Sequence, residues 1–347
     1  MIKVKSLVIN LSLVFFSLAI LLLIIEGGLR VVAAIKRNFL GSDLYVCGNV
    51  YLINPALFKK ALSPDPNFMP VNIETSVAGR HVRTNSSGMR AERDYSLNKA
   101  LGVYRIATIG DSVTFGWGVD YNEAYPAVLE NILRARFGDK VEVLNFGMPS
   151  LNSQEELLLL KSKILNYDPN LIIIGYHPND IYYDLKLVHF FNTFVPRFLA
   201  ERSRLYGCVF SVWQHLTNSY APYYQEAYKK GSPLWETQKS FFAELSFISR
   251  EKKIPILVVV LPEWRDFSDK HRLKQVYDLV SGEAIKNGLS ALNVFSMLRD
   301  KGVTDVEKNY RVDFNSEDYD HPNRVGHEAI AGLIFEFLLK SGFLRSN

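Results

Sequence analysis

The chain has 347 residues, enough for one large α/β domain with additions, and its formal net charge is only +4 with acidic and basic residues interspersed. Because the sequence contains no basic block and no zinc-finger spacing, its composition excludes a dedicated nucleic-acid binder. The two cysteines, Cys47 and Cys208, lie far apart, so the sequence neither predicts a disulfide nor shows a metal-binding spacing around either one.

A long apolar segment near the N-terminus predicts a membrane anchor. Leu7 to Ile25 contains no charged residue, and a helix of roughly 20 residues is long enough to cross the bilayer core. A cleaved signal peptide is the closest alternative, but its apolar core of about 7–15 residues is shorter, and Val31 to Ala34 form a poor cleavage site. We therefore expect an uncleaved anchor over residues 1–37. Basic residues lie on both sides of the span, so its orientation stays open.

Residues 38–100 show little periodicity and are expected to form a connecting region with a small β-hairpin. Within this region, Arg80 to Arg90 (RHVRTNSSGMR) indicates a strand, a polar turn at Asn85 to Gly88, and a returning strand.

From Tyr104 onward, strands and helices alternate. Short apolar runs predict buried strands at residues 104–109, 141–146, 171–174, 254–261 and 289–294. Helices are predicted at residues 124–137, 153–166 and 325–339, with Pro126 in the first turn of the first helix and Ser153 as the cap of the second. Strands that alternate with helices predict an α/β fold with a parallel sheet.

A long insertion, Ile181 to Ser232, interrupts this alternation and is rich in Tyr, Phe and Trp. Because a structureless loop of this length is uncommon in a compact domain, we expect a helix over residues 199–216. Its aromatic side chains either form a lid or wall for an acyl or sugar group, or pack the insertion onto the domain. The sequence favours neither interpretation.

Four short polar segments occur at the predicted ends of strands or directly before the last helix. They cover residues 110–112, 145–150, 175–180 and 318–327. In open α/β sheets, ligands bind outside the carboxyl ends of the strands. We therefore expect the segments to form one site.

Acyl transfer needs the residue types that these segments contain. Ser112 is a candidate nucleophile, and His321 is a candidate general base because the pKa of imidazole lies near neutral pH. Asp318, three residues before His321, is placed to orient the imidazole and to stabilise its charged form. Candidate donors to an oxyanion are the N–H of Ser112, the N–H of Gly147 and the side-chain amide of Asn179.

Other roles for these and neighbouring residues were compared with acyl transfer. Asp111 and Ser112 alone could simply cap a helix, and His327 is expected to pack or cap at the start of the last helix. A metal site would have to use Asp318, Asp320, His321 and His327. It lacks an i, i+4 helical pair and would leave the other three segments unexplained, so we expect no metal.

Three further polar residues of the segments are expected to have supporting or passive roles. Asp111 is expected to fix the turn around Ser112, and Asp180 to hold the loop that carries Asn179. His177 could touch a substrate, but an exposed loop histidine is the commoner case.

The chain resembles the SGNH, or GDSL-type, hydrolase family, whose name lists Ser, Gly, Asn and His in separate blocks. Here these residues match Ser112, Gly147, Asn179 and His321, with Asp318 three positions before the histidine. The matching blocks span Tyr104 to Ala331. The strings RTNSSGMR and GDSVTFGWGV also resemble bacterial membrane-anchored members. The departures are mild: Val113 replaces the leucine of GDSL, and Ser150 stands where a second glycine is common.

The resemblance implies a three-layer α/β/α sandwich with a flavodoxin-like parallel sheet of about five strands, in a hydrolase-like domain over residues 101–345. It implies cleavage of an ester-linked acyl group through an acyl-serine, without metal, nucleotide or other cofactor. The implied partners are a lipid or acylated glycan ester and a membrane, and the domain is expected outside the cytoplasm.

Two other functions remain open at this point. One is an O-acyltransferase that passes an acetyl group to a cell-envelope polysaccharide. The other is a catalytically silent binding module. The intact set of Ser112, Asp318 and His321 counts against the silent module, because a silent copy has no chemical reason to keep all three residues.

Overall fold

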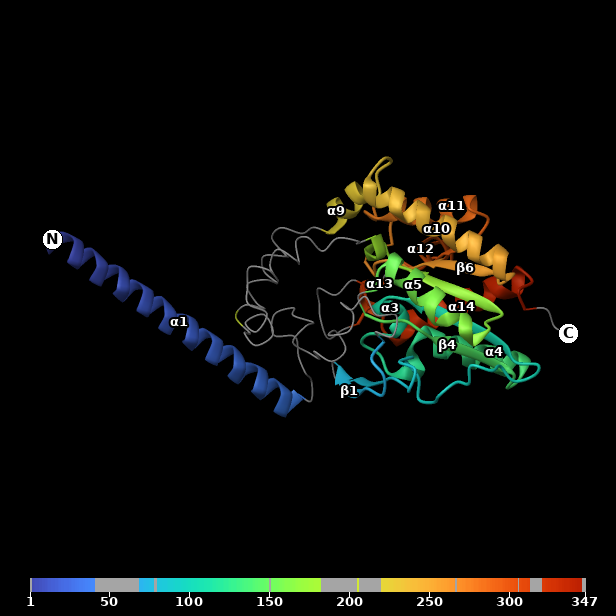
Figure 1. Ribbon diagram of the computed structural model, residues 1–347, viewed down its shortest axis with the longest axis horizontal. Coiled ribbons are helices and arrows are strands. Elements are labelled where there is room, and N and C mark those ends of the chain that lie inside the picture. Colours follow the sequence, from blue (N-terminus) through green and yellow to red (C-terminus); the bar gives the residue numbers. More distant parts are fainter. Residues whose placement is uncertain are drawn as a thin grey trace. The chain divides into compact units, whose positions relative to one another are not determined.

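The computed structural model describes residues 2–40, 69–77, 80–149, 151–181, 205, 220–265, 267–304, 306–312 and 320–344. The chain divides into two compact units, one that contains the N-terminal helix α1 (Ile2–Leu40) and one that contains an α/β domain. Within α1, Ser12–Val31 has a mean hydropathy of 2.3 and none of it is buried. This helix, seen at the N-terminus in Figure 1, is long and apolar enough to cross a membrane, and a signal sequence would share these features.

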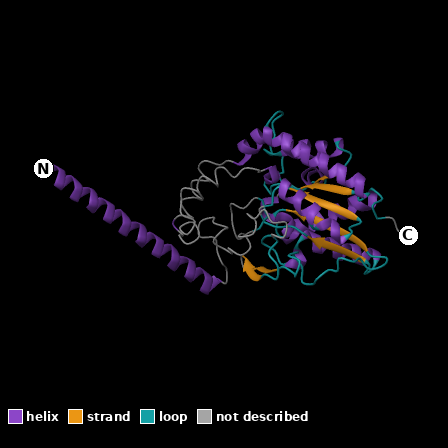
Figure 2. Ribbon diagram, in the orientation of Figure 1, coloured by secondary structure: helices purple, strands orange, loops and turns teal. Residues whose placement is uncertain are grey.

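The α/β domain contains a five-stranded parallel sheet between two layers of helices (Figure 2). The strand order is β4-β3-β5-β6-β7, and every neighbouring pair is parallel. The strands are β3 (Tyr104–Gly110), β4 (Val141–Asn145), β5 (Leu171–Tyr176), β6 (Ile256–Val260) and β7 (Ser290–Asn293). This is the flavodoxin-like strand order. The predicted fold class is confirmed.

Helices cover both faces of this sheet. On one face α4 (Tyr125–Phe137) packs against α14 (Arg324–Lys340), which also contacts α12 (Val294–Asp300). On the other face α10 (Pro233–Lys252) contacts α5 (Ser153–Ser162) and α11 (Lys274–Lys286). The remaining short helices are α3 (Ser112–Phe115), η2 (Tyr121–Glu123), η3 (Ile164–Tyr167), η4 (Pro178–Ile181), α9 (Tyr220–Ala227) and α13 (Val306–Asn309).

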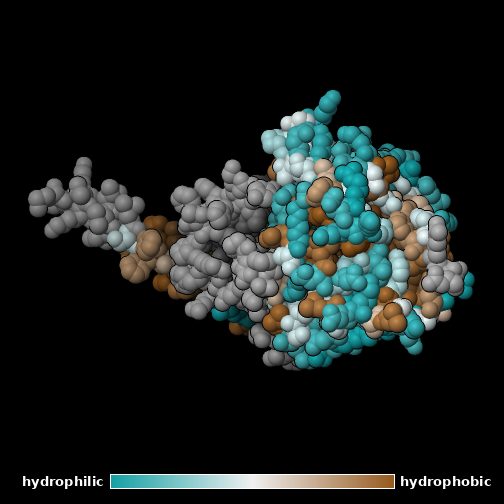
Figure 3. Space-filling model, turned by 45° about the vertical axis from the view of Figure 1, so that its right-hand side comes forward, coloured by the Kyte–Doolittle hydropathy of each residue, from teal (hydrophilic) through white to brown (hydrophobic). Residues whose placement is uncertain are grey.

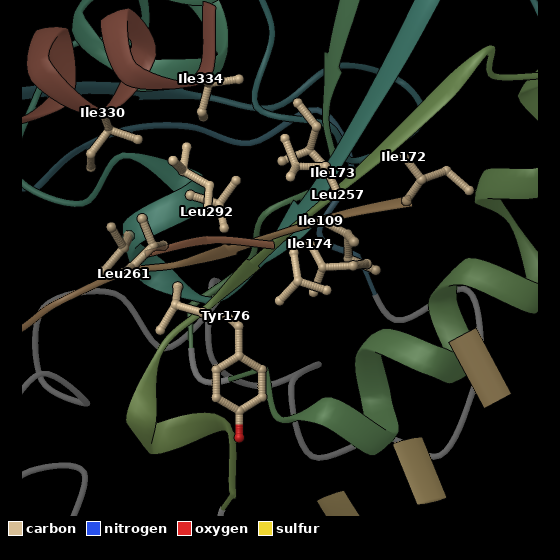
Figure 4. Packing of buried hydrophobic residues seen from close by; sticks show 14 of the residues in the cluster. Ile109, Ile172, Ile173, Ile174, Tyr176, Leu257, Leu261, Leu292, Ile330 and Ile334 are labelled. Atoms are coloured by element: carbon tan, nitrogen blue, oxygen red, sulfur yellow. The ribbon is translucent and has the colours of Figure 1, made fainter. Parts of the chain in front are cut away.

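The central strands are buried on both faces, which explains why they are continuously apolar rather than alternating. All six residues of β5 are buried. Figure 4 shows Ile330 and Ile334 of α14 on one side of the strands and Tyr176 pointing to the other side. Outside this core, the face of the α/β domain shown in Figure 3 is mainly hydrophilic, with smaller hydrophobic areas between.

The hairpin lies earlier in the chain than the sequence predicts. β1 (Glu74–Val77) pairs in antiparallel fashion with β2 (Arg80–Arg83), and no strand follows the turn at Asn85 to Gly88. After this turn, Met89 enters the core and Arg90 N donates to Asn145 O at 3.1 Å. Met69, Ala91 and Tyr95 belong to the same core. Part of the segment before the sheet thus contributes side chains to the core of the α/β domain. The boundaries between an anchor, a connecting region and a hydrolase-like domain stay a prediction.

The cap of α5 is Asn152, not Ser153 as predicted. Asn152 accepts hydrogen bonds from Gln154 N and Glu155 N, and Glu155 completes a capping box. Ser153 is instead buried, and its hydroxyl contacts Gln238 on α10. The side chain of Ser153, the first residue of α5, therefore links α5 to α10 rather than capping α5.

Only part of the aromatic insertion is described. The helix predicted over 199–216 lies outside the described residues except for Leu205, as do Cys47 and Cys208. At the C-terminal end of the insertion, Tyr228 is buried and its hydroxyl lies 2.7 Å from that of Tyr176 at the end of β5. This part of the insertion packs onto the domain.

Two glycines at the ends of the central strands make room for the short helix α3. Gly110 and Gly175 pair in register, and a Cβ added to either would lie 2.2 Å from Thr114 Oγ1. Thr114 Oγ1 in turn lies 3.0 Å from the hydroxyl of Tyr125. The glycines let α3 lie directly against the ends of both strands.

We therefore expect Gly110→Ala to lower the free energy of unfolding by about 1–3 kcal/mol or more, because the added methyl group overpacks the contact with Thr114. Gly282→Ala is the matched control. Gly282 lies exposed inside α11, and a Cβ there meets nothing within 4 Å. This control should be neutral or stabilising by about 0.5–1 kcal/mol. Urea unfolding of the three proteins measures the difference, and equal stability of both variants would contradict the described contact.

Candidate active site

Ser112 begins α3 directly after the central strand β3. Asp111 is the N-cap of α3, and its Oδ1 accepts a hydrogen bond from Val113 N at 2.9 Å. The helix ends after one turn at Gly116, which has a φ of 87°. Asp111 thus fixes the turn around Ser112, as predicted, and Ser112 stays half-buried at the carboxyl edge of the sheet.

The hydroxyl of Ser112 meets the imidazole of His321. Ser112 Oγ lies 2.8 Å from His321 Nε2, which is hydrogen-bond distance. The segment that carries His321 is held by backbone hydrogen bonds, from Val312 N to His321 O and from Asn323 N to Tyr310 O. The structure therefore brings together the predicted nucleophile and the predicted base.

Asp318 lies outside the described residues, so its role as the carboxylate partner of His321 stays a prediction. Asp320, which is described, is half-exposed, and its Oδ1 lies 3.8 Å from His177 Nε2.

His177 is fully buried, which contradicts the expectation of an exposed loop histidine. The cause is the tight turn that follows β5. His177 N donates to Asp180 Oδ2 at 2.7 Å, and Asp180 N donates to His177 O at 2.9 Å. These two bonds draw the loop inward and confirm that Asp180 holds it. Asn179 lies between them, half-buried, and its Oδ1 has no hydrogen-bond partner among the described residues.

Gly147 lies against the nucleophile helix, but its N–H is already engaged. A Cβ on Gly147 would lie 2.3 Å from Phe115 N, so only glycine allows this approach. Gly147 N donates to Asn145 Oδ1 at 2.9 Å, while Asn145 Nδ2 donates to Thr114 O at 2.9 Å. Asn145 therefore ties the second segment to α3. Sequence reasoning included Asn145 in this segment but missed its role, because a pattern does not show which amide its side chain binds.

His327 caps a helix and does not contact Ser112. It is fully buried on α14, and its Nδ1 accepts a hydrogen bond from Tyr125 N, the first residue of α4, at 3.2 Å. Burial, and then the neighbouring His321, lower the pKa of His327 to about 3. The imidazole is therefore neutral near pH 7, as its capping role requires.

Glu156 lies in the first turn of α5, where an exposed acidic side chain would interact favourably with the helix dipole. The side chain is fully buried instead, and burial together with the charge of Asp111 raises its pKa well above the ordinary value. Among the described residues, no group of three or more His, Cys, Asp or Glu side chains is placed to hold a metal ion.

Comparison with known families gives one match, to the GDSL-like Lipase/Acylhydrolase family over residues 108–329, which is more than half of the chain. Comparison with curated proteins gives no match.

Several solved structures are similar to this chain. One is a lipase/acylhydrolase from Enterococcus faecalis, with 15% identity, a TM-score of 0.43, and coverage of 69% of this chain and 97% of that chain. Another is a catalytic mutant of Axe2, an acetylxylan esterase from Geobacillus stearothermophilus, with 14% identity, a TM-score of 0.44, and coverage of 72% and 100%. A third is a two-domain esterase (CEX) active on acetylated mannans, with 15% identity, a TM-score of 0.42, and coverage of 69% and 49%.

The neutral state of His327 predicts a specific loss of stability in acid. Its pKa in the folded chain, about 3, lies below the ordinary value. As pH falls below about 6.5, the unfolded chain therefore binds a proton that the folded chain does not bind. The free energy of unfolding then falls by up to about 1.4 kcal/mol per pH unit. In His327→Asn the amide oxygen can accept the Tyr125 N–H without titrating. We expect the free energy of unfolding to fall less steeply below about pH 6.5 in this variant. Urea unfolding at several pH values measures both slopes, and equal slopes would rule out the buried neutral imidazole.

Proposed function

Since the chain belongs to the GDSL-like lipase/acylhydrolase family, we propose that it is a serine esterase that cleaves an ester-linked acyl group through an acyl–Ser112 intermediate. The observation that carries the proposal is the 2.8 Å contact between Ser112 Oγ and His321 Nε2. A serine hydroxyl is a weak nucleophile, and an adjacent imidazole is the kind of base that activates it.

In the acylation step, His321 Nε2 takes the proton from Ser112 Oγ while Oγ forms a bond to the ester carbonyl carbon. The carbonyl oxygen becomes an oxyanion. When this tetrahedral species collapses, the carbon–oxygen bond to the alcohol breaks and His321 gives its proton to the departing alcohol oxygen. The acyl group is left as an ester of Ser112.

In the deacylation step, water loses a proton to His321 Nε2 and attacks the acyl-enzyme carbonyl carbon. The bond to Ser112 Oγ breaks, the proton returns to Ser112, and a carboxylic acid leaves. If a glycan hydroxyl replaces water in this step, the same intermediate gives acyl transfer.

We assign the oxyanion to donors at the carboxyl edge of the sheet. Ser112 N lies at the positive end of α3, and Asn179 contributes its side-chain amide. Gly147 N serves as a third donor only if it shares its proton with Asn145 Oδ1. Asp318 is proposed to accept from His321 Nδ1 and to stabilise the imidazolium.

Replacing the nucleophile tests the esterase activity directly. In the full-length protein in detergent, we expect Ser112→Ala to lower kcat/KM for p-nitrophenyl acetate by about 10⁴-fold or more, because no covalent intermediate forms. Ser240→Ala, an exposed serine on α10, is the matched control and should keep the parent rate. A folded Ser112→Ala variant with the parent rate would refute the proposal. A parent that releases p-nitrophenol only when a glycan is supplied, with the acyl group recovered on the glycan, would point to transfer.

We also propose that α1 is retained as an anchor, that it holds the α/β domain at a membrane outside the cytoplasm, and that the ester is carried by a lipid or an acylated glycan there. Support comes from Ser12–Val31, whose apolar surface is exposed in the structure. Burying this surface in lipid removes it from water.

The anchor is tested on the protein isolated from its own cells. We expect an intact N-terminus by mass spectrometry and retention in the membrane pellet after alkaline extraction, because an intact span of about 20 apolar residues does not leave the bilayer. A chain cut after α1 and recovered in the soluble fraction would show a signal sequence instead.

A further inference from the structure

We propose that Glu156 is a positioning residue that holds a buried proton and couples the turn of Ser112 to the turn of Asn179. The inference rests on the proposed function, because it assigns Glu156 a part in the same acyl-transfer site. It concerns a side chain that does not touch the reacting atoms.

Glu156 occupies an unusual place for a carboxyl group. It lies in the first turn of α5, where it is 1% exposed, and neither of its carboxyl oxygens has a hydrogen-bond partner among the described residues. A buried charge without a partner is costly. One turn earlier, the hydroxyl of Ser153 lies 3.0 Å from Asp180 O. The helix that carries Glu156 is therefore fixed directly to the loop that carries Asn179.

The charges that act on Glu156 are negative. Asp111 acts on it from the turn before α3, and Glu155 from its own helix. Asp180, on η4, is influenced by both Glu156 and Asp111. The phenols that face Glu156 are Tyr125 of α4 and Tyr176 of β5, and its charge acts on both. All of these carboxyl and phenol groups are acidic, so none of them supplies a positive charge that would balance an ionised Glu156.

Hydrogen bonds indicate which carboxyl group keeps the proton. Asp180 Oδ2 accepts a hydrogen bond from His177 N. Such bonds favour the ionised form of a carboxyl group, and Glu156 accepts none among the described residues. The pKa of Asp180 is raised as well, first by burial and then by the negative charge of Glu156. When Glu156 is neutral, the second of these two effects is absent. Like charges in one buried site cannot all ionise, so the proton stays on Glu156.

A neutral Glu156 can donate its proton in a hydrogen bond. Asp180, on which the charge of Glu156 acts, is also buried, and its Oδ1 has no hydrogen-bond partner among the described residues. If Glu156 ionises, its negative charge is felt at the buried carboxyl groups of Asp111 and Asp180, and the repulsion disturbs the turns that place Ser112 and Asn179. Small misplacements of this kind lower kcat more than they raise KM.

The first arm of the test measures stability and needs no substrate. The pKa of Glu156 is raised in the folded chain, so the folded chain holds a proton that the unfolded chain has lost, and stability falls as pH rises. We expect the thermal midpoint of the full-length parent to decline between about pH 5 and about pH 9, and Glu156→Gln to flatten this decline. Glu251→Gln, an exposed glutamate at the end of α10, is the matched control and should follow the parent.

The second arm measures turnover of p-nitrophenyl acetate against pH. We expect the kcat of the parent to decline at alkaline pH, where Glu156 ionises. Glu156→Gln, which stays neutral and can donate a hydrogen bond, should keep the kcat of the parent near neutral pH and should not show this decline. Glu156→Ala, which cannot donate, should lose up to about 10²-fold in kcat with little change in KM.

Two results overturn the inference: a stability slope that Glu156→Gln leaves unchanged, or equal losses of kcat in the Gln and Ala variants at every pH. If the parent turns over no ester but Glu156→Gln flattens the dependence of the thermal midpoint on pH, the proposed function is refuted. The buried proton on Glu156 is established in that case.

Discussion

The hydrogen bond between Ser112 Oγ and His321 Nε2 joins side chains that lie 209 positions apart in the chain. Each of the two side chains is held in place by contacts with neighbouring parts of the fold. The helix α3 is a single turn, too short to be stable alone. It keeps its place because Asp111 caps it, Asn145 binds Thr114 O, and three glycines let it lie against the strand ends. His321 precedes α14, and His327, on that helix, caps α4. The sheet edge, the caps and the last helix thus converge on one contact.

The segment before the sheet supports the same helix from another direction. Arg90 is fully buried, its guanidinium Cζ lies 4.6 Å from the centre of the Phe115 ring, and its Nη2 donates to His81 O and Val119 O. Burial lowers the pKa of Arg90 to about 10. Buried polar groups of this kind reduce stability unless they are paired, and they gather here around the site. Arg90 packs on the helix that begins with Ser112, His177 lies in the loop that carries Asn179, and Glu156 lies on the helix bonded to that loop.

The positions of the strands follow from the sequence because buried parallel strands are continuously apolar and end at recognisable turns. The flavodoxin-like arrangement of the sheet was implied by the family resemblance, because apolar runs do not determine strand order. The structure confirms the parallel sheet and brings Ser112 to His321. The helices α10 and α11 were not predicted, although both are amphipathic and α10 begins with Pro233, which is a sequence signal for the start of a helix. Burial of His177 and Glu156 was missed for a different reason. His177 belongs to a polar segment and Glu156 to the first turn of a predicted helix, and only tertiary contacts decide which polar side chain turns inward. The engaged N–H of Gly147 likewise depends on the rotamer of Asn145.

The claim that His321 activates Ser112 is tested most directly by labelling the folded, full-length protein with a fluorophosphonate and locating the adduct by mass spectrometry. The account predicts one adduct, on Ser112, with a labelling rate that rises as His321 loses its proton and that falls by orders of magnitude in His321→Asn. Labelling at another residue, or a His321→Asn variant that labels Ser112 as fast as the parent does, would contradict it.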